Sequence, residues 1–423
     1  MKAMMKAAAV VVGLLAFATP ALAVDFFGYF RDGTSLSSKG GPAPTFQTPG
    51  MDYKLRLGNE SDTYGEWGIQ NVIYKDKSGV EVTAGVMFAY YVGADSQPGG
   101  AGASDSTKAG FVPFGIQQDY FKIKIPQWAG ATFWGGKQYY ERENIDMIDH
   151  FYLNTGSVPG IGVENVDTGF GKLSFSVFGV GGTDANSNNV IFLRPDLRLQ
   201  GIPVWTNGTL TVDLNYETIS RHSGLPAPQD EGGGVWATLE WHQDAILGGW
   251  NNIAVAYSNG ANANQNAGAP GRQNKNDSQV SVWEQLLLQP IDMFQVLVGG
   301  TYQTKKFGIV GGGSDTLNSF GLFARPKVWL ADYFAIQGDI GYTAVDAKPN
   351  GGTEVKPNLV KWTIAPTILP GPMAGGFFVR PEIRLYVTGG SWNDDATKNG
   401  IAGGNFGTDT SGTTYGVQAE GWF

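Results

Sequence analysis

The chain has no cysteine, and beyond its first residues it has no long uninterrupted hydrophobic run. Without cysteine, neither a disulfide scaffold nor a thiolate metal site can form. After residue 23, no segment approaches the roughly 20 apolar residues that a membrane-spanning helix needs. If the protein enters a membrane, it therefore does so with β-strands.

Histidine is scarce as well, with three residues in 423, and neither an HExxH motif nor a GxSxG elbow occurs. We therefore expect that the protein is not an enzyme. The alternative is a hydrolase that uses the three histidines. The acids at Asp394-Asp395 and around Asp315 lack the spacing of a calcium loop, so we expect no metal and no cofactor. The net charge of -9 disfavours nucleic acid as a partner.

The first 23 residues have the pattern of a secretory signal peptide. Lys2 and Lys6 precede an apolar stretch, and Ala21-Leu22-Ala23 is a small-x-small cleavage site. The mature chain would begin at Val24. Because no linker or shift in composition divides it, we expect residues 24–423 to form a single domain.

What the chain does contain is glycine (62 residues), aromatic residues (13%) and alternating strands. Its last twelve residues alternate and end on an aromatic. One face carries Tyr415, Val417, Ala419 and Phe423, and the other carries Gln418, Glu420 and Trp422. A strand with one apolar and one polar face, at the end of an exported chain, is typical of a transmembrane barrel.

Alternation along the chain predicts an all-β protein, an 18-stranded antiparallel transmembrane barrel. The predicted strands are 25–31, 63–75, 79–93, 117–126, 131–140, 161–168, 172–180, 190–200, 208–221, 233–242, 250–259, 278–288, 293–303, 316–328, 333–344, 356–366, 376–388 and 412–423. A further candidate, 51–58, is assigned to the first loop, because short periplasmic turns then alternate with long extracellular loops and both termini are periplasmic. A β-sandwich or propeller is the alternative fold.

Five strands place an aromatic residue on their polar face: Tyr29, Tyr64, Trp250, Phe378 and Trp422. In a barrel these residues would face the lumen, where they either fill space or present flat apolar surfaces to a ligand. A row of such surfaces beside charged groups suits a sugar, whose ring faces are apolar and whose rim carries hydroxyls. The charged loop 141–160 either folds into the lumen and narrows it or is a solvated outer loop.

The chain resembles the maltoporin family of outer-membrane sugar porins. The matching stretches include Val24 to Arg31 (VDFFGYFR), Arg56 to Glu60 (RLGNE), Trp134 to Lys137, Met147 to Asp149, Gly169 to Ser174 (GFGKLS) and Trp422-Phe423. The resemblance implies a homotrimer of 18-stranded barrels in the bacterial outer membrane, each with an inward-folded third loop. It also implies an oligosaccharide substrate that moves along an aromatic slide.

By position, the resemblance assigns all five aromatic residues to that slide. It implies a flanking polar track and constriction formed by Arg31, Arg56, Glu66, Arg142, Asn144, Asp146, Asp149 and Phe151. Asn144, Asp146 and Phe151 depart from the family pattern, which affects maltodextrin specificity more than sugar transport. Thr45 and Ser61 replace the family's first-loop disulfide, so packing and hydrogen bonds must hold that loop. No tryptophan of the second loop can extend the slide.

These observations predict a porin for facilitated diffusion of maltose, maltodextrins or related oligosaccharides. A general diffusion porin for small hydrophilic solutes is the alternative. The two differ in whether the lumenal aromatics bind sugar.

Overall fold

The computed structural model of the protein describes residues 24–92, 114–153, 158–184, 186–222, 224, 231–263, 274–309, 313–371 and 373–423. The predicted signal peptide and most of the predicted second loop lie outside these residues. Within them, no helix is long and apolar enough to cross a membrane. The described chain is almost entirely β-sheet.

Eighteen strands form one sheet. They are β1 (Asp25–Ser37), β2 (Thr63–Lys75), β3 (Glu81–Val92), β4 (Phe114–Lys124), β5 (Thr132–Lys137), β8 (Pro159–Asp167), β9 (Lys172–Thr183), β10 (Asn189–Trp205), β11 (Gly208–Arg221), β12 (Gly234–Ile246), β13 (Gly249–Asn259), β14 (Ser278–Ile291), β15 (Phe294–Gly308), β16 (Ser314–Ala331), β17 (Phe334–Lys348), β18 (Asn358–Ile368), β19 (Glu382–Trp392) and β20 (Ser411–Trp422). A separate hairpin joins β6 (Glu143–Ile145) to β7 (His150–Leu153). The short helices are η1 (Gly260–Asn262), η2 (Met373–Gly375), α2 (Asp394–Lys398) and η3 (Ile401–Gly404).

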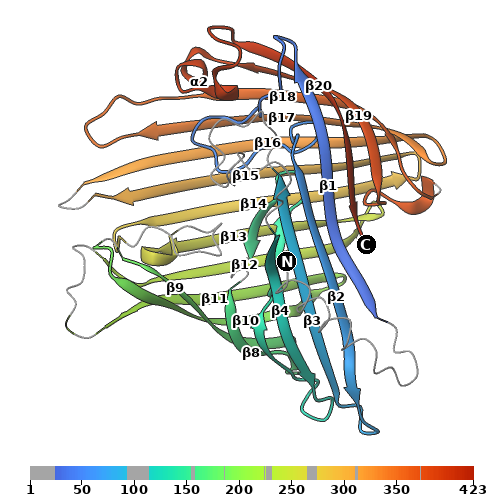
Figure 1. Ribbon diagram of the computed structural model, residues 1–423, viewed down its shortest axis with the longest axis vertical. Helices are drawn as coiled ribbons and strands as arrows, with labels where there is room; N and C mark the ends of the chain where they lie inside the picture. The colour runs from blue at the N-terminus through green and yellow to red at the C-terminus, as the bar shows by residue number, and fades with distance from the viewer. Residues whose placement is uncertain are drawn as a thin grey trace, which may run out of the picture.

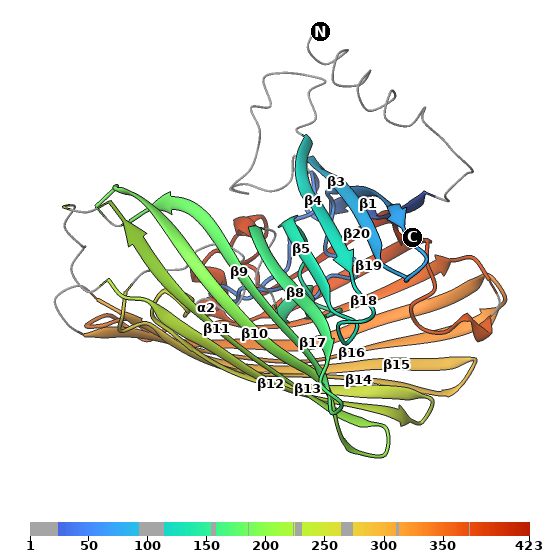
Figure 2. The ribbon, with the colours of Figure 1, turned by 90° about the horizontal axis from the view of Figure 1, so that it is seen from below.

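The sheet closes into a barrel because its first and last strands pair. Consecutive strands of the wall are antiparallel neighbours, and β1 pairs with β20 from Tyr29 opposite Trp422 to Ser37 opposite Thr414. Figures 1 and 2 show the strands following one another round the wall, with β1 beside β20. The predicted 18-stranded antiparallel barrel is confirmed.

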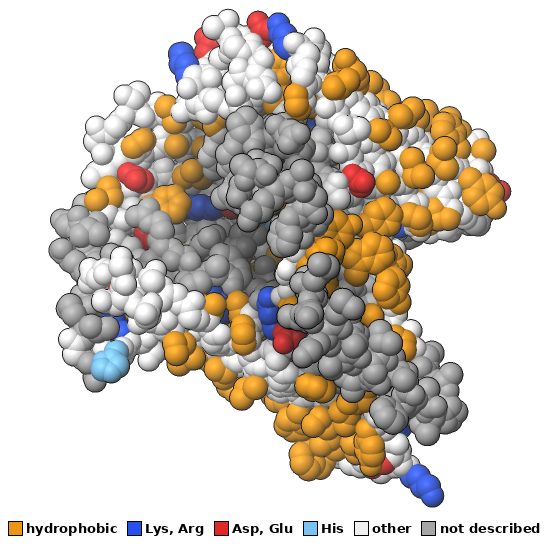
Figure 3. Space-filling view, in the orientation of Figure 1, with side chains coloured by type: hydrophobic (Ala, Val, Ile, Leu, Met, Phe, Trp, Pro, Cys, Tyr) orange, Lys and Arg blue, Asp and Glu red, His pale blue; other side chains and the backbone are white. Residues whose placement is uncertain are grey.

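The two faces of the wall differ as the alternation predicts. On β11, Val212 and Leu214 are 43% and 47% exposed, whereas Asp213 and Asn215 are each 2% exposed. Hydrophobic side chains gather over the strands at the right of Figure 3. An apolar outer face and a polar inner face are what a barrel needs in lipid, because only the lumen offers polar partners.

The predicted strand 376–388 is wrong at its start. β19 begins only at Glu382, and residues 369–381 form a long link that contains η2. Phe377, predicted to face outward, is instead 4% exposed in the interior. The period-two rule fails here because the backbone before Glu382 is not extended sheet.

The predicted alternation of connection lengths is also wrong at three places. The outer connections 184–188 and 309–313 are as short as the turn 76–80, because the strands on either side continue further than predicted. The link 369–381 is long where a short turn was predicted. Longer strands shorten the connection between them without changing the topology.

The first loop lies inside the barrel, as an extended segment rather than a strand. From 51 to 58 its apolar side chains Met51, Tyr53, Leu55 and Leu57 are buried, while Lys54 and Arg56 between them stay partly accessible. Thr48 Oγ1 lies 2.6 Å from Thr343 Oγ1, and Lys361 Nζ donates to the Leu57 carbonyl over 2.8 Å. Ser61, one of the two residues at the family's disulfide positions, shares a hydrogen bond with Ser35. Packing and hydrogen bonds therefore hold this loop.

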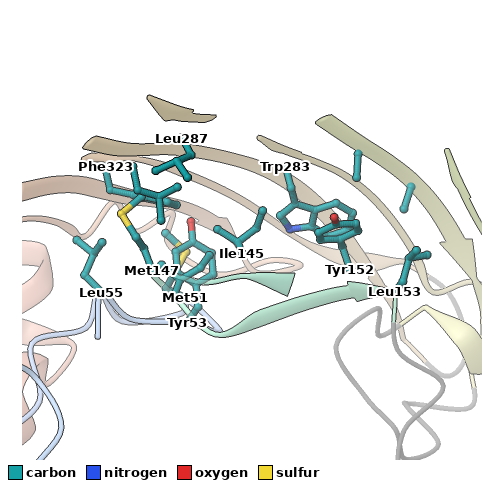
Figure 4. Close-up of a cluster of buried hydrophobic side chains, with 14 of the residues drawn as sticks. Met51, Tyr53, Leu55, Ile145, Met147, Tyr152, Leu153, Trp283, Leu287 and Phe323 are labelled. Carbon is teal, nitrogen blue, oxygen red and sulfur yellow. The ribbon is translucent and has the colours of Figure 1, made fainter. Parts of the chain in front are cut away.

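The described part of the third connection, residues 138–153, also folds inward, as predicted. Its Ile145, Met147 and Tyr152 are 0–1% exposed in a cluster with the first loop and with wall residues of β13, β14, β15 and β16. Figure 4 shows Met51, Tyr53 and Leu55 packed beside Met147, beneath Leu287 and Phe323 of the wall. The two loops are joined directly, because Arg56 N donates to the Met147 carbonyl over 3.0 Å.

Candidate functional site in the barrel lumen

The predicted residues of β1 and β2 meet at the seam of the barrel. The rings of Tyr29 and Tyr64 lie 6.0 Å apart between centroids and are both partly accessible. The Tyr29 hydroxyl donates to Glu420 Oε1 over 2.8 Å and accepts from Arg56 Nη2 over 2.6 Å. These contacts place two aromatic faces beside a charged group from the closing strand.

Arg31 and Arg56 belong to the same network, because both pair with Glu60. Arg31 Nη2 lies 2.7 Å from Asp62 Oδ2, and its Nη1 lies 3.2 Å from Glu60 Oε2. Arg56 Nε lies 3.1 Å from the same Glu60 oxygen. Both arginines were predicted for the polar track, and the ion pairs fix them beside the two tyrosines.

Glu66, Arg142 and Phe151 form a second group, which also contains Tyr139. The hydroxyls of Tyr64 and Tyr139 both donate to Glu66 Oε1. The Arg142 guanidinium lies over the Tyr139 ring at 3.2 Å and over the Phe151 ring at 4.6 Å. The third loop thus brings a cation and two rings toward the polar face of β2.

The remaining predicted loop residues lie on the β6–β7 hairpin. Asn144 pairs with Phe151 across it, and Asp149 is exposed at the turn. Asp146 is anchored to the wall: its backbone N–H donates to Gln285 Oε1 over 2.7 Å, and Gln285 Nε2 donates back to Oδ2 over 3.2 Å. Burial raises the pKa of the Asp146 carboxyl, against the opposing effects of that hydrogen bond and of nearby arginines.

A narrow cavity brings Phe378 and Trp422 together. Both residues line it, with Arg56, Asp146 and Glu420. The Arg380 guanidinium lies over the Trp422 ring at 4.2 Å. Phe378 reaches this position from the link before β19 rather than from the strand that the sequence predicts.

Trp250 stands apart from these residues. It lies at the start of β13, opposite Leu287 of β14, and its ring is 6.3 Å from the ring of His242. It packs against the buried cluster of the two inward loops, as Phe378 does. The structure therefore gathers the predicted site residues in several groups along the lumen wall.

Accessibility separates the five predicted slide residues from other inward aromatics. Trp236, Trp283 and Trp329 also face inward, but each is at most 1% exposed. Tyr29, Tyr64, Trp250 and Phe378 are all partly accessible, and Trp422 is 40% exposed. The first set fills space, whereas the second presents ring surface to the lumen.

The sequence reasoning missed Tyr139, Arg325 and Gln285 as site residues. Parity within the predicted strand 131–140 places Tyr139 with outward-facing Lys137, but β5 ends at Lys137 and the chain then turns inward. Arg325 and Gln285 lie on inward faces of their strands, which alternation does show. Alternation alone cannot say which inward residues the loops will cover.

Among the described residues, no group of three or more histidine or acidic side chains is placed to hold a metal ion. His150 is buried in the third loop, whereas His242 lies on β12. The arrangement provides aromatic surfaces, ion pairs and hydrogen-bonding groups along a passage. It is suited to reversible binding of a polar solute.

A closed 18-stranded antiparallel barrel, with an apolar outer face and a polar lumen narrowed by inward loops, defines the chain as an outer-membrane porin. The family model of the LamB porins matches residues 24–423, nearly the whole chain. The chain therefore belongs to the LamB porin family, and the resemblance found in the sequence is confirmed. Family and fold indicate a channel rather than an enzyme.

Several porins of known structure are similar to the chain over almost its full length. OpdK of Pseudomonas aeruginosa, in a structure with vanillate, shares 10% identity, covers 95% of this chain and 98% of its own, and has a TM-score of 0.48. An anion-selective porin from Comamonas acidovorans shares 10% identity over 95% of this chain and 100% of its own (TM-score 0.41). The trimer form of OmpT from Vibrio cholerae shares 11% identity over 96% and 100% (TM-score 0.40).

Proposed function

We propose that this porin is a sugar-selective channel for facilitated diffusion of maltose, maltodextrins or related oligosaccharides. Tyr29, Tyr64, Trp250, Phe378 and Trp422 form its aromatic slide. The flanking polar track and constriction consist of Arg31, Arg56, Glu66, Arg142, Asn144, Asp146, Asp149 and Phe151. Sugar rings stack on the aromatic faces while their hydroxyls exchange hydrogen bonds with the charged side chains.

The observation that carries this proposal is the accessible ring surface of the five aromatics beside ion-paired arginines. If these rings only filled space, burial like that of Trp283 would be expected. Transport also needs weak binding, because a millimolar dissociation constant corresponds to only about -4 kcal/mol. A few stacking contacts and hydrogen bonds therefore suffice.

A general diffusion porin is the second candidate, because the same ion pairs would line a non-selective pore. Blocking of single-channel current by sugar in planar lipid bilayers separates the two. Maltotriose or sucrose should interrupt the current of the sugar channel, and Trp250→Ala should weaken that block. Tyr257→Ala, on the outer face of the same strand, is the matched control. Current that neither sugar changes up to tens of millimolar contradicts the proposal.

We further propose that residues 1–23 are a cleaved export signal and that the barrel assembles in outer-membrane lipid as a homotrimer. A pair of opposite charges on the outer face of β4 and β5 supports the trimer. Asp119, flanked by the inward residues Gln118 and Tyr120, lies directly across from Lys137 on this face. A lysine on the lipid-facing side of a barrel costs up to about 2–4 kcal/mol, depending on its depth, and an acid costs less, so another copy of the chain is the more favourable neighbour.

A further inference from the structure

The cavity that holds Phe378 and Trp422 has an unusual concentration of arginine. Arg56, Arg325, Arg380 and Arg384 all line it, and the two acids in its lining are Asp146 and Glu420. Four guanidinium groups against two carboxylates leave an excess of two positive charges in the lining of the cavity. Such a cavity is suited to a negatively charged group.

Two of these guanidinium groups retain a donor without a partner among the described residues. Arg380 Nη1 donates to the Val379 carbonyl over 3.0 Å and to Glu382 Oε1 over 2.6 Å, whereas its Nε is buried and has no acceptor. Arg325 Nη2 donates to Asp339 Oδ2 over 3.1 Å, and its Nε is likewise without an acceptor. Their side chains are only 6% and 8% exposed. The carboxylates around Arg325 and Arg380 therefore leave part of the hydrogen-bonding capacity of both guanidinium groups unused.

The carboxylates of the neighbouring wall are shared among more cations than they can balance. Glu382 lies within 4 Å of Lys327, Arg380 and Arg384. Asp339 pairs with Arg325 at 3.1 Å and with Lys361 at 3.7 Å. Glu420 pairs with Arg384 and with Arg56. Arg56 also pairs with Glu60. Three carboxylates of the wall thus face five cations besides Arg56.

The third loop supplies the fourth acid. Asp146 lines the cavity, and Gln285 holds its carboxylate there over 3.2 Å. A carboxylate held in the lining of a positive cavity competes with any anion that enters it. Removing its charge should therefore strengthen anion binding, whereas most loop substitutions would weaken binding or leave it unchanged.

We propose that this cavity binds the negative group of an anionic saccharide, a sugar carboxylate or sugar phosphate. The inference rests on the proposed sugar channel and adds a charged substrate class to it. Arg325 and Arg380, which line the cavity, donate to the anion. Phe378 and the Trp422 ring offer apolar surface to the attached sugar. Asp146 sets the affinity by competing for the same arginines.

The test is block of single-channel current by glucose, glucuronate and glucose 1-phosphate at equal ionic strength. Inorganic phosphate serves as the anion without a sugar. In the wild-type channel, both charged sugars should block at concentrations about tenfold below that of glucose, a difference that one additional charged hydrogen bond can supply. Equal block by glucose and by both charged sugars overturns the inference while leaving the sugar channel intact.

Three variants and one control test whether the residues of this cavity cause the stronger block by charged sugars. Arg325→Gln and Arg380→Gln should bring the block by charged sugars to the level of glucose, whereas Arg221→Gln, near the outer end of β11, should not. Asp146→Asn should tighten block by the charged sugars relative to block by glucose; an unchanged or lower ratio of the two overturns the inference. This variant and the wild-type comparison decide the matter even if the arginine variants fail to fold. Block by inorganic phosphate equal to that of the charged sugars, with no block by glucose, contradicts the sugar channel and the inferred sugar contact together.

Discussion

The Tyr29 hydroxyl donates a 2.8 Å hydrogen bond to Glu420 Oε1, joining the first strand of the barrel to the last across 391 residues of sequence. The same hydroxyl accepts from Arg56, which comes from the inward first loop. The Tyr29 side chain therefore links the first and last strands, holds the first loop and provides part of the accessible aromatic surface. This connection suggests how sugar binding and barrel stability can be tested separately.

Tyr29→Phe should destabilise the barrel and keep most of its sugar affinity. The substitution removes the hydroxyl from three charged partners, Glu420, Arg56 and Arg31, but retains the ring, so we expect a loss of about 1–3 kcal/mol. Urea unfolding of the purified protein measures this loss. Tyr415→Phe, on the outer face of β20, is the control. Equal unfolding midpoints for the two variants would show that the bond across the seam adds no stability.

Met147→Ala should loosen the third loop. Met147 is 0% exposed between the two inward loops, and truncating a fully buried methionine costs about 2–5 kcal/mol. The expected results are a larger single-channel conductance and faster amide exchange in residues 143–153. Met293→Ala, at a position 52% exposed in a periplasmic turn, should change neither. Unaltered conductance and exchange in Met147→Ala would mean that this cluster does not hold the constriction.

Replacing both Asp119 and Lys137 with alanine should change the assembly state without changing the pore. Both side chains lie on the outer face, so losing them removes polar contacts between copies and leaves the lumen intact. Native mass spectrometry in detergent should show a larger share of monomer. Replacing Lys348 and Glu354, an exposed ion pair at the end of β17, with alanine is the control. Trimers as stable as the wild type in the double variant would place the interface elsewhere.

Strand parity predicted the inner and outer faces well where strands are long. Trp422 and Phe423 were assigned to opposite faces, and Trp422 now lines a lumenal cavity while the Phe423 ring stacks on Phe26 at 5.2 Å. The signal is strong because lipid and water impose opposite requirements on successive residues.

Parity failed where the chain leaves the sheet. Phe377 was placed on the wrong face, since β19 begins later than alternation indicates, and β5 ends earlier than its predicted strand. The segment 51–58 alternates like a strand for a different reason: it lies extended along the inner wall with one face buried. The β6–β7 hairpin could not be predicted, because its three- and four-residue strands depend on contacts with the wall.

Sugar block of the current through single channels is the most direct test of the central claim. The account predicts brief, concentration-dependent closures with maltotriose or sucrose in the millimolar range, weakened in Trp250→Ala and Trp422→Ala but not in Tyr257→Ala. Current that both sugars leave unchanged up to tens of millimolar, in a channel that otherwise conducts ions normally, would contradict the account and favour a general diffusion porin.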